Sequence, residues 1–492
     1  MKSLQFLTNL RTLHLKYCKL EGISSFGKLK RLEILSLEGS VFDELPDELG
    51  ELSQLRLLDL FECSTLKRIP PNVLRRLSHL EELYIGSSSY SSWAVEGMDA
   101  ETSNVSLSEL NSLRRLTHLL LHIHDKCLPK DFAFSSTLQS YEITVTQDYE
   151  YSFWYRRTIT IAEKKFSKSR ILNINNEKLT TFAAFKALYP TLEHFKLRDI
   201  EDCENIVPTI DPMGLIELKS LQLRYCRELK RIVDASMQQV PATAFSNLVE
   251  LSLEDLRDLR EICHDGRPPK EFLEKLESVY VIRCHDMYTL FPTMLLQRLH
   301  KLKKADIGYC NKLQEVFELE GLCHSGEENL VLLSSLEELT LLYLPELRCI
   351  WKGPTQYLRL KSLKKFEVGE CNRLTYLFSL SLAQSLIQLE EVIVDDCERL
   401  EHIVSEVEDN KGEENVVAAN GNDILLPKLR KLRLSCLPRL ISLCPKNYKS
   451  TWPTTLEELV LRGFGNFAPS FIVVLEAVMK TAFEVCFYFK FM

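Results

Sequence analysis

Residues 279–290 read VYVIRCHDMYTL, and the same order of apolar and polar residues recurs through the second half of the chain. Two apolar residues flank a single residue, a cysteine follows three places later, and two more apolar residues come at three-residue intervals. The copies begin about 26 to 30 residues apart, or further where an insert intervenes. A period of this length predicts a solenoid, in which each repeat packs only on its neighbours. The clearest copies are LQLRYCRELKRI at 221–232, ADIGYCNKLQEV at 305–316, FEVGECNRLTYL at 366–377 and VIVDDCERLEHI at 392–403.

The spacing L-x-x-L-x-L-x-x-C/N is that of a leucine-rich repeat. It predicts an α/β fold, a horseshoe-shaped solenoid with a parallel β-sheet on its concave face and short helices or irregular segments on its convex face. In each repeat the two flanking apolar residues point into the core, because side chains alternate along a strand. The residue between them points to the concave face. Residues 295–302 and 382–389 have apolar spacing that suits short convex helices.

We count fifteen clear repeats and two doubtful ones, the latter near residues 138–143 and 171–174. The pattern weakens between them, where aromatic residues crowd at 149–155 as either a covered core seam or an exposed contact patch. Two inserts, at 319–329 and 405–423, interrupt the later repeats, and the second is acidic. We therefore divide the chain into four parts. They are an N-terminal leucine-rich repeat array at 1–124, irregular or degenerate repeats at 125–190, a cysteine-bearing array at 191–465, and an apolar tail, a possible cap, at 466–492.

Composition and the two ends of the sequence argue against several classes of function. The net charge of −8 argues against general nucleic-acid binding, which prefers a basic face. The first residues lack the features of a secretory signal, and charged residues interrupt the apolar tail, which makes it a poor membrane span. Fifteen cysteines follow the repeat rather than a C-x-x-C pattern, so neither a zinc site nor a disulfide scaffold is expected. We expect a reducing, cytoplasmic location.

The repeated cysteine occupies the slot that closes each strand. A thiol is a small hydrophobe and a weak donor, so it can fill this slot and bond to backbone at the turn. The alternative is redox sensing or metal capture by stacked thiols, notably Cys284 with Cys310 and Cys371 with Cys397. We favour the structural role, because buried apolar thiols are unreactive.

The sequence predicts no enzyme. It has no phosphate-binding loop, no G-x-G-x-x-G, no H-E-x-x-H and no G-x-S-x-G, so we assign no catalytic, cofactor-binding or metal-binding residue. His118, His122 and His124 are spaced somewhat like metal ligands. We expect His122 and His124 to share one side of a strand and His118 to fall opposite, in structural or surface roles.

Residues expected on the concave face give the stronger functional hypothesis, which is that they bind a partner. The residue just before the cysteine slot is expected at the rim of the sheet, and in this series tyrosine and arginine give way to acids. Tyrosine and arginine are enriched in binding hot spots, since they combine area with hydrogen bonding. The alternative is that tyrosine simply suits strands. The candidate partner-binding residues are Tyr225, Tyr280, Arg283, Tyr309, Tyr343, Glu370 and Asp396.

The sequence LRLLDLFECSTLKRIP at 55–70, with Leu45-Pro46 ahead of it, resembles the leucine-rich region of plant intracellular nucleotide-binding disease-resistance proteins. The later repeats, which end in Ile or Leu followed by Phe, resemble those of the coiled-coil class. The resemblance implies a region that senses a pathogen effector or a guarded host protein and restrains a nucleotide-binding switch domain. It also implies that ATP or ADP would belong to a nucleotide-binding domain absent from this chain, so no cofactor is expected here.

We therefore predict a protein-recognition module of plant innate immunity, with a protein partner, no nucleic acid and no membrane span. The nucleotide-binding domain would be a partner in cis if it is encoded upstream. The main alternative is a leucine-rich repeat substrate receptor of a ubiquitin ligase, which would need an F-box-like segment ahead of the repeats. An extracellular receptor ectodomain would need a signal peptide and paired capping cysteines.

Overall fold

The computed structural model divides into two compact units, residues 1–202 and 203–492, which we call the N-terminal and C-terminal units. Each is described by itself. The residues that the structure describes are 2–86, 93–95, 104–146, 169–175, 178–236, 240–264, 267–321, 331–405, 426–441, 443 and 455–463.

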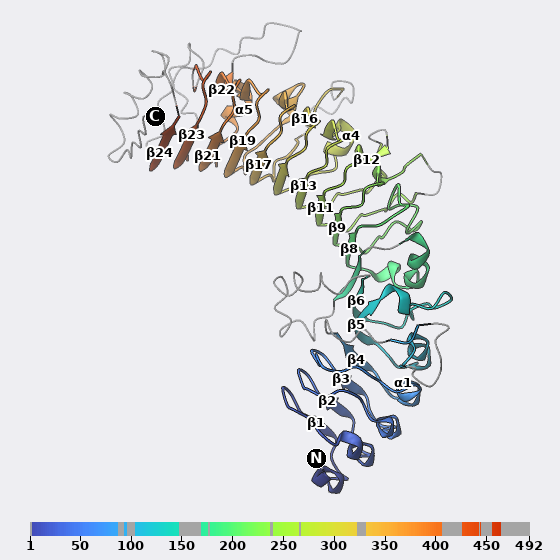
Figure 1. Ribbon diagram of the computed structural model, residues 1–492. Helices are drawn as coiled ribbons and strands as arrows, with labels where there is room; N and C mark the ends of the chain where they lie inside the picture. Colours follow the sequence, from blue (N-terminus) through green and yellow to red (C-terminus); the bar gives the residue numbers. More distant parts are fainter. Residues whose placement is uncertain are drawn as a thin grey trace. The chain divides into compact units, whose positions relative to one another are not determined.

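In the N-terminal unit each repeat adds one strand to a parallel sheet (Figure 1). Consecutive strands pair residue for residue, as Leu13 with Leu35 and Leu35 with Leu58. The two doubtful repeats are strands, β6 and β7, which pair with each other and with their neighbours. The strands are β1 (Thr12–His14), β2 (Ile34–Ser36), β3 (Leu57–Asp59), β4 (Glu82–Ile85), β5 (His118–His124), β6 (Ser140–Thr146), β7 (Arg170–Asn175) and β8 (His194–Arg198).

The C-terminal unit repeats the same arrangement. Its main-sheet strands are β9 (Ser220–Arg224), β11 (Glu250–Glu254), β13 (Ser278–Ile282), β15 (Lys304–Gly308), β17 (Glu338–Leu342), β19 (Lys365–Gly369), β21 (Glu391–Asp395), β23 (Lys431–Ser435) and β24 (Glu458–Arg462). With the eight strands before them they make the seventeen that the repeat count predicts. The predicted leucine-rich repeat solenoid is confirmed.

The core lies behind the main sheet. In β13, Val279 and Val281 are fully buried and Tyr280 between them is half-buried, which is the predicted alternation. Burying an aliphatic side chain of this size contributes about 1.5–3 kcal/mol before the entropy cost of ordering it. The same alternation recurs in β11, β15, β17 and β19, so each repeat contributes two inward side chains to one continuous core.

The far side of the core carries short helices, as predicted, and also short parallel strands, which were not predicted. The helices expected at 295–302 and 382–389 are present but shorter, as α4 (Thr293–Leu296) and α5 (Leu380–Gln384). The outer strands form three small sheets in the C-terminal unit. They are β10 (Arg231–Val233) with β12 (Glu261–Cys263), β14 (Thr289–Phe291) with β16 (Glu315–Glu318) and β18 (Cys349–Lys352), and β20 (Tyr376–Ser379) with β22 (His402–Ser405).

The apolar pair that closes each repeat explains these outer strands. Its second member is often aromatic, and Phe291, Phe317 and Trp351 stack in register. Their ring centroids are 5.4 and 5.0 Å apart, with interplanar angles of 16° and 8°. The indole N–H of Trp351 donates to the carbonyl of Leu377, at 3.1 Å, in the next repeat. The outer strands thus add a second row of contacts between repeats.

The far side of the N-terminal unit consists mainly of short 3-10 helices, three to seven residues long. The segments with helical geometry in the rest of the described chain are α1 (Val73–Arg76), η1 (Lys2–Phe6), η2 (Ile23–Lys28), η3 (Asp47–Glu51), η5 (Leu107–Ser112), η6 (Asp125–Cys127), η7 (Leu179–Phe185), η8 (Tyr189–Thr191) and η11 (Thr355–Tyr357). None of the described helices is long and apolar enough to cross a membrane.

One expectation about side-chain direction is wrong. Strand β5 runs without interruption from His118 to His124, and its residues alternate between half-buried and buried. His118, His122 and His124 are an even number of residues apart, so all three lie on one face, and His118 does not fall opposite. Within the described parts of the chain, no three His, Cys, Asp or Glu side chains are grouped as metal ligands.

Several predictions fall on residues outside the described ranges. These are the aromatic cluster at 149–155, most of the inserts at 319–329 and 405–423, and the apolar tail at 466–492. The four-part division of the chain stays a prediction.

Candidate protein-binding surface

A row of left-handed residues follows the main-sheet strands of the C-terminal unit. On the seven successive repeats from β9 to β21, the residue that precedes the cysteine slot has a φ between 48° and 58°. Residues other than glycine adopt this conformation at a cost of roughly 1–2 kcal/mol and persist there only where the surroundings impose it. We call these residues the left-handed row: Tyr225, Asp255, Arg283, Tyr309, Tyr343, Glu370 and Asp396.

A backbone hydrogen bond to the next repeat accompanies this turn throughout the row. The N–H of each residue in the left-handed row donates to a carbonyl of the next repeat, as Tyr309 to Leu342 at 2.9 Å and Tyr343 to Gly369 at 2.8 Å. Where a cysteine follows, its buried thiol can add a weaker bond to the preceding repeat, as Cys310 to Val281 at 3.9 Å, but Asp255 and Tyr343 are followed by leucine. With the backbone N–H held by the next repeat, the side chain in the row is directed outward.

The cysteines that follow the left-handed row are inaccessible to solvent. Cys284, Cys310, Cys371 and Cys397 are fully buried. Burial raises the pKa of Cys310 to about 11, and it also raises the pKa of Cys284 well above its usual value. The hydrogen bond between Cys371 and Cys397 raises the pKa of Cys371 and lowers that of Cys397. A buried, protonated thiol is a poor nucleophile and a poor metal ligand, so the geometry favours the structural role over redox sensing.

Three of the candidate residues form one stack. The guanidinium of Arg283 lies 5.6 Å from the ring centroid of Tyr309. The rings of Tyr309 and Tyr343 are 5.0 Å apart at an angle of 19°. Arg283 also lies 3.4 Å from the carboxylate of Asp255. Both tyrosines keep more than two fifths of their surface in solvent, at 42% and 44%.

An apolar floor lies beside this stack. Ile282 and Leu342 end their strands just before the left-handed row and are half-buried. Leu342 covers two glycines on neighbouring strands. A Cβ added to Gly308 would lie 3.2 Å from the Leu342 carbonyl, and one added to Gly369 would lie 3.0 Å from the Leu342 Cδ2. Gly369 therefore leaves room for the Leu342 side chain, and Gly308 leaves room for the Leu342 backbone carbonyl.

The remaining candidates lie near the stack without joining it. Tyr225 packs against Arg224, whose guanidinium is 5.7 Å from the ring centroid. Tyr280 occupies the between-leucine position of β13, and the amine of Lys304 lies 6.0 Å from its ring centroid. Tyr280 thus lies within a main-sheet strand, and the other candidates lie in the left-handed row.

Glu370 and Asp396 continue the left-handed row beyond Tyr343, and both are exposed. Asp395 is exposed beside them. Within the described ranges, no Lys, Arg or His makes an ion pair with any of these three carboxylates. On β15, burial raises the pKa of the half-buried Asp306 and Glu367 raises it too, while Lys304 and Lys365 lower it. This end of the surface therefore carries negative charge that the described neighbours leave unpaired.

The apolar floor and the left-handed backbone conformation were not predicted from the sequence, although the sequence contains an indication of each. Apolar Ile282 and Leu342 occupy a position that is charged in other repeats, as at Arg224 and Asp395. The left-handed slot admits glycine elsewhere, at Gly463. Glycine and aspartate recurring at one repeat position indicate a positive φ.

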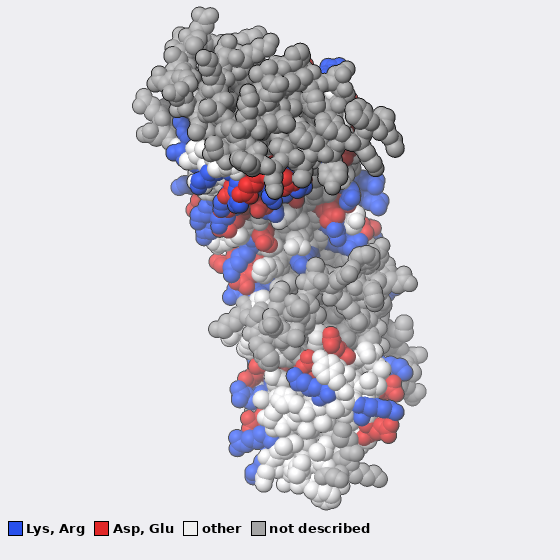
Figure 2. Space-filling view, turned by 90° about the vertical axis from the view of Figure 1, so that its left-hand side faces the viewer, with Lys and Arg blue, Asp and Glu red and all other residues white. Residues whose placement is uncertain are grey.

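Charges elsewhere on the molecule mostly neutralise one another. At the start of the main-sheet strands, opposite charges pair between repeats, as Lys303 with Glu277 at 2.9 Å and Lys364 with Glu337 at 2.7 Å. On the face that Figure 2 shows, basic and acidic side chains are interspersed, and the basic ones do not gather into a patch.

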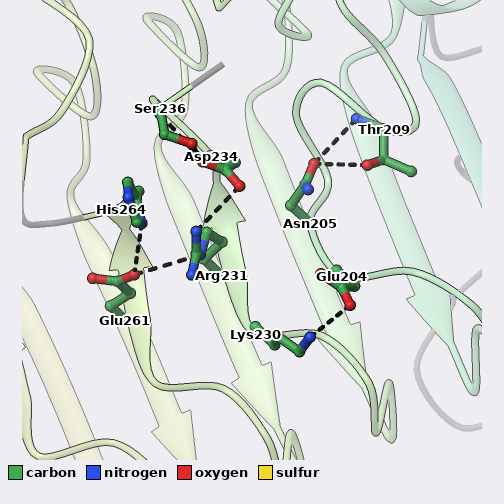
Figure 3. A network of polar contacts seen from close by, with 9 residues as sticks. All are labelled: Glu204, Asn205, Thr209, Lys230, Arg231, Asp234, Ser236, Glu261 and His264. Atoms are coloured by element: carbon green, nitrogen blue, oxygen red, sulfur yellow. Dashed lines mark hydrogen bonds and ion pairs between the residues drawn. The ribbon is translucent and has the colours of Figure 1, made fainter.

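A polar network on the outer strands has a different character (Figure 3). Arg231 on β10 lies 3.1 Å from Asp234 and 3.4 Å from Glu261 on β12, and His264 lies 3.4 Å from the same Glu261. These groups pair with one another across neighbouring repeats. The arrangement joins β10 to β12, so we assign it a structural role.

Comparison with known proteins agrees with this geometry. A family model described as "Plant disease resistance protein RPS2-like, leucine-rich repeats" matches residues 160–304 and 247–398. The "Disease resistance protein At4g27190" of Arabidopsis thaliana is 28% identical over 391 residues, which cover 76% of this chain and 37% of that protein. The "Probable disease resistance protein At4g27220" of the same plant is 27% identical over 403 residues, covering 70% and 41%. The chain therefore spans about two fifths of the length of these relatives.

Solved structures show distant likeness. An internalin, InlF, from Listeria monocytogenes is 17% identical with a TM-score of 0.41, covering 80% of this chain and 88% of that one. A chain of the LRIM1/APL1C complex is 14% identical with a TM-score of 0.39, covering 77% and 55%. These scores add nothing to the fold, which the repeat geometry itself defines. The strand geometry shows a leucine-rich repeat solenoid, and the family model and the two Arabidopsis relatives show that the chain is similar to the leucine-rich repeat regions of plant disease resistance proteins.

Proposed function

We propose that this chain is a protein-recognition module of plant innate immunity and that the main-sheet face of its C-terminal unit binds the recognised protein. The partner would be a pathogen effector or a guarded host protein. The observation that carries the proposal is the exposed stack of Arg283, Tyr309 and Tyr343 beside the apolar floor of Ile282 and Leu342. Aromatic and arginine side chains held rigidly over apolar surface are typical of binding hot spots.

The same proposal extends to the whole protein. A recognition role needs no catalytic residue and no cofactor in this chain, and ATP or ADP would be bound by a separate nucleotide-binding domain. We propose that the repeats restrain that domain until the partner binds, in the cytoplasm. The disease-resistance names of the two relatives support this extension.

The test begins with partner identification by proximity labelling in leaf tissue, with and without pathogen challenge. The identified partner is then purified, and its affinity for the chain is measured with the variant Tyr309→Asn/Tyr343→Asn. Asparagine tolerates a positive φ, so this variant removes the rings without adding backbone strain. We expect a loss of affinity of at least tenfold.

The matched control is Tyr288→Asn. Tyr288 is 53% exposed and precedes the outer strand β14, away from the main-sheet face. Its loss should leave affinity within twofold of the unaltered chain. Equal affinity for the double variant and the unaltered chain, with both folded, would show that the surface does not bind the partner.

A further inference from the structure

We infer that this surface recognises an extended, arginine-containing segment of its partner, across the exposed edge from Tyr309 to Asp396. The inference rests on the proposed function, because it names the chemistry of the segment that the proposed protein-binding surface takes. It follows from the order of side chains along the left-handed row, from the length of the row, and from the carboxylates at its end.

The row already shows how it holds a guanidinium. Arg283 lies between a ring and a carboxylate, 5.6 Å from the Tyr309 centroid and 3.4 Å from Asp255. Cation–π attraction and charge pairing act on it together. Tyr343 and the exposed Glu370 bring a ring and a carboxylate together again, here on adjacent repeats without an intervening one, and no described arginine pairs with this carboxylate. A partner guanidinium beside Tyr343 and Glu370 would make the same two kinds of contact, with a ring and with a carboxylate, that Arg283 makes within the chain.

The charge balance favours a cation over other occupants. Glu370, Asp395 and Asp396 are exposed, and the described residues hold no basic group in ion-pair distance of them. An anionic partner such as a nucleic acid or a phosphopeptide would be repelled here. Arginine fits better than lysine, because its planar guanidinium stacks on a ring and bonds a carboxylate at the same time.

The geometry also sets the length of the segment. Tyr309, Tyr343, Glu370 and Asp396 lie on four successive repeats. Three steps between neighbouring strands span roughly 14 Å, which is about the length of four extended residues. The half-buried Leu342, on the second of these repeats, would receive the apolar parts of such a segment. Exposed ends of partner loops and termini can supply a stretch this short.

The test uses the full chain and labelled nonapeptides of alternating glycine with arginine, lysine or glutamate, with binding followed by fluorescence anisotropy at low and physiological salt. We expect the arginine peptide to bind more tightly than the lysine peptide and the glutamate peptide not to bind. The variants Glu370→Gln/Asp396→Asn and Tyr343→Asn should each lower the affinity for the arginine peptide at least tenfold.

The control variant Glu228→Gln/Asp258→Asn removes two exposed charges from earlier repeats and gives the chain the same net charge. Its affinity for the arginine peptide should stay within twofold of that of the unaltered chain. If the control variant lowered this affinity as much as Glu370→Gln/Asp396→Asn does, binding would reflect general charge attraction, and the inference would be wrong. It would also fall if the arginine peptide did not bind, or if the chain dimerised through this edge.

The two proposals fail separately. If the identified partner loses affinity for Tyr309→Asn/Tyr343→Asn but not for Glu370→Gln/Asp396→Asn, the protein-binding surface stands and the arginine segment does not. If both variants bind the partner as tightly as the unaltered chain does, this surface does not bind the partner and the proposed function of the surface is wrong.

Discussion

The left-handed row makes a prediction whose sign depends only on backbone geometry. Glu370 has a φ of 53°, and its side chain is exposed. Alanine at a positive φ keeps the clash of its Cβ with the backbone, and glycine removes it, a difference of about 1 kcal/mol. Both substitutions delete the same carboxylate, so its contribution cancels in the comparison. We therefore expect Glu370→Gly to be about 1 kcal/mol more stable than Glu370→Ala.

The neighbouring Glu367 provides the control, because it lies within strand β19 of the same repeat. There glycine adds conformational freedom to the unfolded chain without relieving a clash, so Glu367→Gly should be less stable than Glu367→Ala by about 0.5–1 kcal/mol. Free energies of unfolding come from equilibrium urea titration, followed by the tryptophan fluorescence of the chain, to which Trp351, buried in the adjacent outer sheet, contributes. If alanine is at least as stable as glycine at residue 370, the left-handed geometry and the argument built on it are wrong.

Three further predictions follow from the core. Phe317 is fully buried in the aromatic stack, so Phe317→Ala should cost about 3–5 kcal/mol in urea unfolding and Phe317→Leu clearly less; equal costs would mean that the stack is loosely packed. Asp59 is buried and accepts hydrogen bonds from Ser36 at 2.7 Å and from the Phe61 N–H at 3.1 Å, so Asp59→Ala should cost about 1–3 kcal/mol, and an unchanged urea midpoint would contradict this. The pKa of Cys310 is raised from 9.0 to about 11, so its thiol should stabilise the fold fully below pH 9 and lose that contribution as pH rises towards 11; a Cys310→Ala variant with the same alkaline loss of stability would refute this.

The sequence predicted the main sheet because each of its strands leaves a local signal. The pair Val279 and Val281 flanks one residue at the period of a strand, and the cysteine three places on marks where the strand ends. The outer strands, such as Thr289–Phe291, are three or four residues long, and a single apolar pair does not distinguish a strand from a turn. Their pairing depends on the neighbouring repeat, which is a tertiary effect.

The candidate surface was predicted in its residues but not in its geometry. The position before the cysteine slot follows from the repeat, and it identified Arg283, Tyr309 and Tyr343. The stacking order follows from the strand register, which brings residues of successive repeats side by side. The positive φ is accompanied by a backbone hydrogen bond to the next repeat, as from Tyr343 to Gly369, and sequence periodicity alone does not show this bond.

The backbone of the left-handed row helps to distinguish a binding role from simple strand preference. Tyrosine suits strands, but Tyr309 and Tyr343 lie just beyond their strands, at φ values of 57° and 58°, where strand propensity does not apply. Glycine, asparagine or aspartate would be the least strained residues there, and glycine occupies the slot at Gly463. Stacking of the two rings stabilises the fold by about 0.5–1.5 kcal/mol, whereas the backbone strain costs roughly 1–2 kcal/mol at each tyrosine. The stacking therefore offsets the strain at one of the two tyrosines and not at both. Two adjacent tyrosines held exposed in strained positions are better explained by contact with a partner than by stability of the fold, and the Tyr309→Asn/Tyr343→Asn variant separates these two explanations directly.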